Sequence, residues 1–150
     1  MREYIKTCIQ DSIDTKRRLY ENEELLDKIE AAATACITAY KAGGKVLACG
    51  NGGSASDAQH LVGELVVRYK IERFGIAAIA LNSNVAVMTA LGNDYSYDEI
   101  FSKQVRALGK KSDVLFGIST SGNSANIVKA FEQAKKQGIY TVSLTGEGGG

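Results

Sequence analysis

The stretch from residue 117 to residue 124 reads Gly-Ile-Ser-Thr-Ser-Gly-Asn-Ser and is rich in groups that bind oxyanions. Four of its side chains carry hydroxyl groups: Ser119, Thr120, Ser121 and Ser124. An apolar run at 114–118 predicts a strand before it, and the pattern at 125–137 predicts a helix after it. Such a turn places hydroxyls and backbone N–H groups at the positive end of the helix, where phosphate binds well. This stretch, the serine loop, is predicted to hold a phosphate group.

A second set of reactive side chains falls on the helix predicted from Ser54 to about Tyr69. At about 100° per residue, one sector of this helix is polar; it holds Asp57, His60, Glu64 and Arg68. The opposite side is apolar and is expected to face the core through Ala58, Leu61, Val62, Leu65, Val66 and Tyr69. His60 and Glu64 are four residues apart, so their side chains can meet. An exposed face with a chance ion pair is the alternative, but His60 is the only histidine of the chain.

The polar face follows directly on a glycine-rich turn at residues 50–53, Gly-Asn-Gly-Gly, which we call the glycine loop. It is predicted to connect a strand at 45–49 to the helix, with Ser54 and Asp57 placed as a capping box. The dinucleotide fingerprint would need a third glycine at position 55, which is Ala55, and no P-loop motif occurs. A nicotinamide or nucleoside-triphosphate site is therefore disfavoured.

The elements that must position these residues alternate along the chain. Helices are expected at 2–20, 22–43, 54–69, 85–91, 98–108 and 125–137, and strands at 45–49, 76–81, 114–118 and 140–144. The helix at 98–108 should face inward through Ile100, Phe101, Val105 and Leu108, and residues 92–95 should form a loop. Alternating strands and helices predict an α/β fold with a parallel sheet covered on both faces. We expect one domain over residues 1–150, with an N-terminal helical extension of about residues 1–43, and ligands beyond the carboxyl ends of the strands.

Composition excludes several other classes of function. A net charge of +1 gives no electrostatic reason to expect a nucleic-acid or membrane surface. No apolar run approaches the ~20 residues of a membrane span, and the first residues lack the apolar core of a signal peptide. Cys8, Cys36 and Cys49 are odd in number and widely spaced, which favours reduced thiols in the cytoplasm.

Four blocks in order resemble a known family: Cys-Gly-Asn-Gly-Gly-Ser at 49–54, Asp-Ala-Gln-His at 57–60, Gly-Asn-Asp at 92–94, and the serine loop. Together they resemble the sugar isomerase (SIS) domain and, more narrowly, the bacterial phosphoheptose isomerases. The resemblance implies a three-layer α/β/α sandwich with a flavodoxin-like sheet, assembled as a homotetramer with active sites at subunit contacts. It implies isomerisation of D-sedoheptulose 7-phosphate to D-glycero-D-manno-heptose 7-phosphate, the first step towards the ADP- or GDP-heptoses of lipopolysaccharide or capsule.

The resemblance also implies a role for each matched residue. The serine-loop hydroxyls of Ser119, Thr120, Ser121 and Ser124 would hold the phosphate, and Asn51, Gly52, Gly53, Asn93 and Asp94 would contact the sugar. His60 and Glu64 would be ligands of one zinc ion per subunit, with Glu64 also the catalytic base. Family members continue into a further strand and a helix whose glutamine and histidine complete the zinc site, and these elements are expected to be missing from residues 1–150.

Two alternatives share the fold. One is a non-catalytic SIS protein of the kind that binds the replication initiator, and the other is a domain that senses sugar phosphates. Neither needs a His–Glu pair beside the ligand, so His60 and Glu64 favour the enzyme.

Overall fold

The first 34 residues form a unit of their own. The computed structural model describes all 150 residues, and the chain divides into two compact units, Met1–Thr34 and Ala35–Gly150. The first unit contains α1 (Arg2–Tyr20) and the beginning of α2 (Glu23–Lys41). Asn22 caps α2, because its Oδ1 accepts a hydrogen bond of 3.0 Å from the backbone N–H of Leu25. The predicted break between the two helices is therefore confirmed, while the single domain with an extension to residue 43 stays a prediction.

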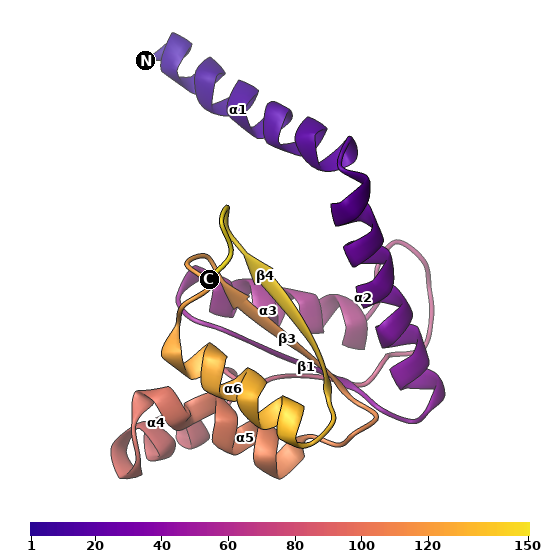
Figure 1. Cartoon of the computed structure of the whole chain (residues 1–150), viewed down its shortest axis with the longest axis vertical. Coiled ribbons are helices and arrows are strands. Elements are labelled where there is room, and N and C mark those ends of the chain that lie inside the picture. The colour runs from indigo at the N-terminus through magenta and orange to yellow at the C-terminus, as the bar shows by residue number, and fades with distance from the viewer. The chain divides into compact units, whose positions relative to one another are not determined.

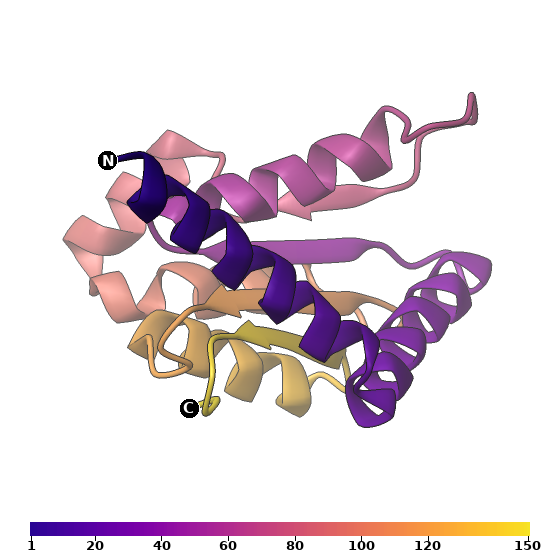
Figure 2. The ribbon, with the colours of Figure 1, turned by 90° about the horizontal axis from the view of Figure 1, so that it is seen from above.

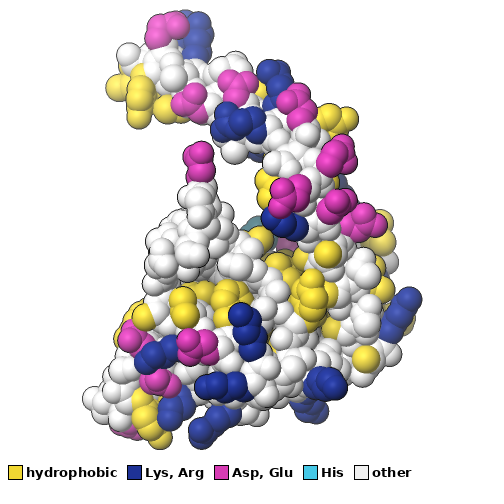
Figure 3. All heavy atoms as spheres, viewed as in Figure 1, with side chains coloured by type: hydrophobic (Ala, Val, Ile, Leu, Met, Phe, Trp, Pro, Cys, Tyr) yellow, Lys and Arg dark blue, Asp and Glu magenta, His cyan; other side chains and the backbone are white.

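No residue of α1 is buried, although the helix has an apolar stripe. Ile5, Ile9 and Ile13 follow helical spacing and are each about half exposed. Acidic and basic side chains are interspersed along the rest of this unit, as Figure 3 shows. The stripe is thus an apolar surface that the unit itself does not cover.

The second unit is built on a four-stranded parallel sheet. Its strands are β1 (Val46–Gly50), β2 (Ala78–Ala80), β3 (Val114–Ser119) and β4 (Tyr140–Thr145). They lie in the order β2-β1-β3-β4 and all point the same way (Figure 2). The predicted parallel sheet is confirmed, with β2 shorter than the expected strand at 76–81.

Helices cover both faces of this sheet, with α5 and α6 on one side and α3 on the other (Figure 1). The helices after α2 are α3 (Gly53–Val66), α4 (Val85–Asp94), the 3₁₀ helix η1 (Tyr97–Glu99), α5 (Ile100–Leu108) and α6 (Ala125–Lys136). Successive strand side chains point to opposite faces. Leu47 and Cys49 of β1 therefore pack with α5 and α6, whereas Ala48 packs against Ala58 of α3. None of these helices combines the length and the apolar character that a membrane span requires.

The start and the end of α3 differ from the sequence prediction. The helix begins after Gly52, which has a φ of +55° and no side-chain cap bond, so the expected capping box of Ser54 and Asp57 is wrong. The helix ends at Val66 rather than near Tyr69. The guanidinium of Arg73 donates hydrogen bonds of 2.6 Å to the Glu64 carbonyl and 2.8 Å to the Leu65 carbonyl. Because these last carbonyls are satisfied from outside the helix, the chain can leave it early.

This early exit also exposes two side chains that the periodicity assigned to the core. Val66 is 46% exposed and Tyr69, which lies outside the helix, is 58% exposed. Ala58 is fully buried as expected, and Leu61 and Val62 pack beside it. Leu65, in the last turn, also packs inward, against the cluster that contains Val46 and Val114, so the inward face of α3 runs from Ala58 to Leu65.

Two further predictions are corrected, one on α4 and one on α5. Asn84 caps α4 by accepting a hydrogen bond from Val87, and the helix then runs through Gly92 to Asp94 where a loop was expected. Helical hydrogen bonding evidently outweighs the turn preference of Gly-Asn-Asp, since the cost of one helical glycine is only ~1 kcal/mol. Leu108, expected to face inward, is 41% exposed because it lies in the last turn of α5.

Candidate functional site

The serine loop and the glycine loop meet at the point where the strand order reverses. After β1 the chain crosses to β2 on one side and then returns to β3 on the other side of β1. The register pairs Gly50, at the end of β1, with Ile118, next to the end of β3. In parallel α/β sheets, ligands bind beyond the carboxyl ends of the strands at this switch point. The two loops singled out from the sequence are therefore neighbours in space.

Three hydroxyl groups of the serine loop cluster at the N-terminus of α6. Ser119 is only 5% exposed, and its Oγ lies 3.0 Å from the Oγ of Ser124 and 3.4 Å from that of Ser121. Ser124 occupies the N-cap position of α6 but makes no capping bond with its side chain. The first turn of α6 consequently keeps N–H groups that no side chain caps, next to the hydroxyls, and Thr120 is exposed beside them. This arrangement suits an anion.

The glycine loop is held in place by an amide–amide contact to α6. Asn51 and Asn126 exchange two hydrogen bonds of 2.9 Å each, Nδ2 to Oδ1 in both directions. Tyr97 also donates its hydroxyl to the Oδ1 of Asn51, at 3.2 Å. Asn51 is half-buried, whereas Gly52 and Gly53 are exposed. The backbone of this loop is thus presented to solvent while the side chain of Asn51 is fixed from behind.

Sequence reasoning missed Asn126 and Tyr97. Asn126 is 3% exposed, although asparagine is seldom buried in the first turn of a helix unless its amide is bonded. The only available signal was an amide at an otherwise inward-facing position of α6, beside Ile127. Nothing local identifies its partner, which lies 75 residues away in the sequence.

His60 and Glu64 meet on α3 as the spacing predicted. Nε2 of His60 lies 3.3 Å from Oε1 of Glu64, and their side chains are 77% and 38% exposed. A catalytic zinc site normally takes three protein ligands and water. Imidazole and carboxylate are suitable donors, but no group of three His, Cys, Asp or Glu side chains occurs in residues 1–150. The pair therefore offers two donor groups, fewer than a catalytic zinc site takes.

Asn93 and Asp94 form a separate exposed pair at the end of α4. Nδ2 of Asn93 donates a hydrogen bond of 2.9 Å to Oδ1 of Asp94. No hydrogen bond or ion pair connects this pair, or His60 and Glu64, to either loop. The structure thus joins the two loops to each other, and the remaining predicted site residues into two further pairs.

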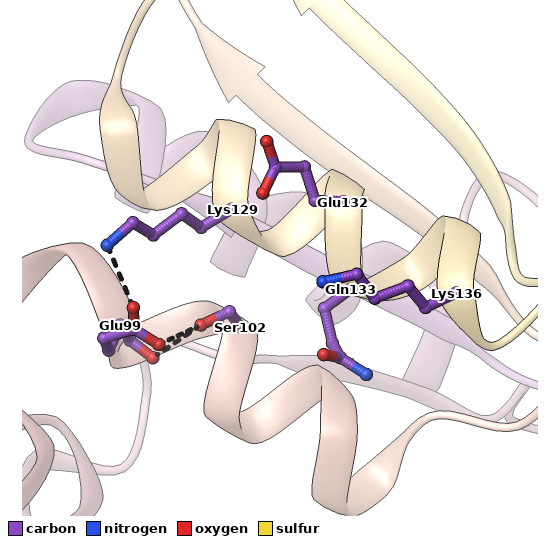
Figure 4. Close-up of a pocket in the computed structure, with 6 residues that line it drawn as sticks. All are labelled: Glu99, Ser102, Lys129, Glu132, Gln133 and Lys136. Carbon is purple, nitrogen blue, oxygen red and sulfur yellow. Dashed lines mark hydrogen bonds and ion pairs between the residues drawn. The ribbon is translucent and has the colours of Figure 1, made fainter.

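Two hollows lie elsewhere on the second unit, and one of them borders the His–Glu pair. It has a volume of about 460 Å³ and a largely apolar lining that includes Glu64; the other lining residues are Leu61, Leu65, Tyr69, Ile71 and Arg73. The other hollow, about 160 Å³, lies between α5 and α6 and is lined by charged and polar side chains (Figure 4). There Glu99 accepts hydrogen bonds from Lys129 and Ser102, at 2.9 and 3.0 Å, so its charge is already compensated.

Comparison with known proteins agrees with this geometry. The family model described as SIS domain matches residues 9–146. The phosphoheptose isomerase of Sulfurimonas denitrificans is 49% identical over 150 residues, covering 100% of this chain and 77% of that protein. The phosphoheptose isomerase of Shewanella loihica is 52% identical over 150 residues, covering 100% of this chain and 75% of that protein.

A solved structure shows the same fold. The phosphoheptose isomerase from Neisseria gonorrhoeae superposes with a TM-score of 0.91 at 42% identity, covering 99% of this chain and 77% of that one. The α/β fold with a parallel sheet predicted from the sequence is confirmed by this likeness and by the strand order. The chain therefore belongs to the SIS domain family and, within it, to the family of the phosphoheptose isomerases.

Proposed function

We propose that this protein is an isomerase that converts D-sedoheptulose 7-phosphate to D-glycero-D-manno-heptose 7-phosphate. The observation that carries the proposal is a match of about half of all residues, over the whole chain, to proteins named phosphoheptose isomerase. The hydroxyl cluster at the switch point supports a phosphorylated ligand. A non-catalytic SIS protein or a sensing domain would require neither this match nor the His60–Glu64 pair.

In this proposal the two loops bind opposite ends of the substrate. The phosphate lies at the N-terminus of α6, where Ser119, Thr120, Ser121 and Ser124 donate hydrogen bonds to its oxygens. The sugar then extends towards the glycine loop and the end of α4, where it contacts Asn51, Gly52, Gly53, Asn93 and Asp94. The support for this direction is the adjacency of the two loops at the sheet's carboxyl edge.

Glu64 is proposed as the general base of the reaction. Its carboxylate removes a proton from C1 of the ketose, which gives an enediol once the carbonyl oxygen at C2 is protonated. Return of a proton to C2, with loss of the proton from the C1 hydroxyl, leaves the aldehyde at C1. A carboxylate with an apolar hollow beside it and an imidazole 3.3 Å away has suitable chemistry for this exchange.

We further propose that His60 and Glu64 are two of the ligands of one zinc ion per subunit. Zinc, when bound, supplies positive charge that stabilises developing negative charge on substrate oxygens. The support is the pair of donors, His60 and Glu64, which lie 3.3 Å apart. The other ligands of the zinc ion are not among the His, Cys, Asp and Glu side chains grouped with this pair. Metal analysis of the purified full-length protein, before and after a chelator, tests this; a metal-free protein with full turnover contradicts it.

The proposed assembly is a homotetramer with active sites at subunit contacts, in the cytoplasm. The exposed apolar stripe of α1 supports the assembly, since an apolar surface of this kind is typical of contact between chains. Light scattering of the full-length protein measures the assembly, and a monomer at micromolar concentration refutes it.

The free cysteines support the cytoplasm as the compartment, because thiols stay reduced there. Cys49 is buried, and burial raises the pKa of its thiol to about 12, so it stays protonated. The heptose product would supply lipopolysaccharide or capsule.

The decisive test is turnover of sedoheptulose 7-phosphate by the full-length protein and by Glu64→Gln. Loss of a well-placed general base costs about 10²–10⁴ in rate, so we expect kcat to fall by this factor while calorimetry still detects substrate binding. Glu72→Gln is the matched control, because Glu72 makes a comparable ion pair with Arg68, at 3.3 Å, four residues apart and outside the site. Unchanged turnover in Glu64→Gln would show that Glu64 is not the general base. An inactive wild type would refute the proposed function.

A further inference from the structure

Asn126 is a buried polar side chain that joins the glycine loop to α6, the helix that follows the serine loop. It lies on α6 two residues after Ser124, the N-cap residue whose hydroxyl belongs to the proposed phosphate cluster. Its amide makes both of its hydrogen bonds to Asn51 of the glycine loop. At 3% exposure it has little room to contact a ligand itself.

The contact constrains Asn51 more than a single hydrogen bond would. Two antiparallel N–H···O bonds between amides fix the plane of each amide group as well as its position. The hydroxyl of Tyr97 adds a third bond to the same Oδ1. A carboxamide oxygen accepts about two hydrogen bonds, so Oδ1 of Asn51 is fully used, while Nδ2 uses only one of its two N–H groups within the protein.

We propose that Asn126 is a positioning residue. It holds the amide of Asn51 so that the free N–H of Asn51 faces the bound sugar. The same contact fixes the distance between the glycine loop and the phosphate cluster. This inference rests on the proposed function, because it assigns the atoms that Asn51 presents to that substrate. The acceptor would be a hydroxyl or carbonyl oxygen of the phosphorylated sugar. A shift of about 1 Å in such a contact costs about 10²-fold in rate.

Asn126→Leu removes both amide bonds while it keeps the size and burial of the side chain. We expect kcat/KM for sedoheptulose 7-phosphate to fall by about 10- to 100-fold. Tyr97→Phe removes only the bond to Oδ1 and should lose less. Gln133→Leu is the matched control, because it removes another amide–amide bond on the same helix, 2.8 Å to Gln137, away from both loops.

A double-mutant cycle separates positioning from general destabilisation. If Asn126 acts through Asn51, Asn126→Leu has no further effect on kcat/KM in an Asn51→Leu background. If the loss of kcat/KM in the double variant equals the product of the losses in the two single variants, the proposal is overturned. An Asn126→Leu variant with wild-type kcat/KM also overturns it.

The side-chain NMR signals of Asn51 provide a readout that does not depend on turnover. Hydrogen bonding displaces the N–H shifts of an amide from those of a free asparagine and slows the exchange of the bonded proton; in Asn126→Leu we expect both signals to move to the values of a free asparagine. Signals unchanged in Asn126→Leu overturn the proposal whether or not the enzyme is active. A wild type that does not turn over sedoheptulose 7-phosphate refutes the proposed function alone, and the NMR result still decides whether Asn126 fixes Asn51.

Discussion

Gly50, the last residue of β1, has no space for a side chain. A Cβ added there would overlap the carbonyl oxygen of Ser54 and lie 2.6 Å from its carbonyl carbon and 2.9 Å from its Cβ. The φ of Gly50 is not positive, so the objection to alanine is steric contact rather than backbone strain. The atoms in the way belong mainly to the backbone of the first turn of α3, which cannot rotate aside. Gly50→Ala must therefore push α3 away from β1.

We expect Gly50→Ala to reduce both stability and activity. Overpacking of this kind costs about 1–3 kcal/mol, and a domain of this size loses roughly 2–4 °C in Tm per kcal/mol. The displaced turn carries Asn51 and the exposed glycines with it, and a displacement of about 1 Å in a binding contact costs about 10²-fold in kcat/KM. Thermal unfolding and turnover of sedoheptulose 7-phosphate measure the two effects.

Gly63→Ala is the matched control on the same helix. A Cβ at Gly63 meets nothing within 4 Å, and alanine is favoured over glycine in a helix by about 0.5–1 kcal/mol. This variant should be slightly more stable than wild type and fully active. A Gly50→Ala protein with wild-type Tm and kcat/KM would show that β1 and α3 are not packed as described.

Two further predictions concern ion pairs of the second unit. The side chain of Asp113 is 1% exposed and accepts hydrogen bonds from Nζ and the backbone N–H of Lys45, at 2.6 and 2.9 Å. Asp113→Ala leaves the lysine unpaired and should lower the free energy of unfolding in urea by about 3–5 kcal/mol. A loss below about 1 kcal/mol would contradict this role. The hydrogen bond from Lys129 lowers the pKa of Glu99 below its ordinary value of 4.5, so the stabilisation is present above that pH and disappears as the pH falls through the lowered pKa. Lys129→Met should accordingly have a lower Tm than wild type at pH 7 but not in acid, and a gap independent of pH would refute this.

Local pattern was sufficient for the elements and for the separate parts of the site. The serine loop was recognisable because its hydroxyls lie between an apolar run and a helical period, and α6 begins directly after Ser124 as predicted. The His60–Glu64 contact followed from a spacing of four residues on one helix. Predictions failed where a contact from outside the helix changed its end, as at Val66, where Arg73 bonds the carbonyls of Glu64 and Leu65.

By itself the sequence determined the order of strands and helices, the parallel sheet and the reactive groups, because these depend on residues close together in the chain. Only the tertiary structure decided that β1 and β3 are neighbours, which brings the glycine loop beside the serine loop. It also decided that Asn126 pairs with Asn51. Hydrogen-bond partners of a buried amide are chosen by packing across 75 residues, and no periodicity in the sequence contains that information.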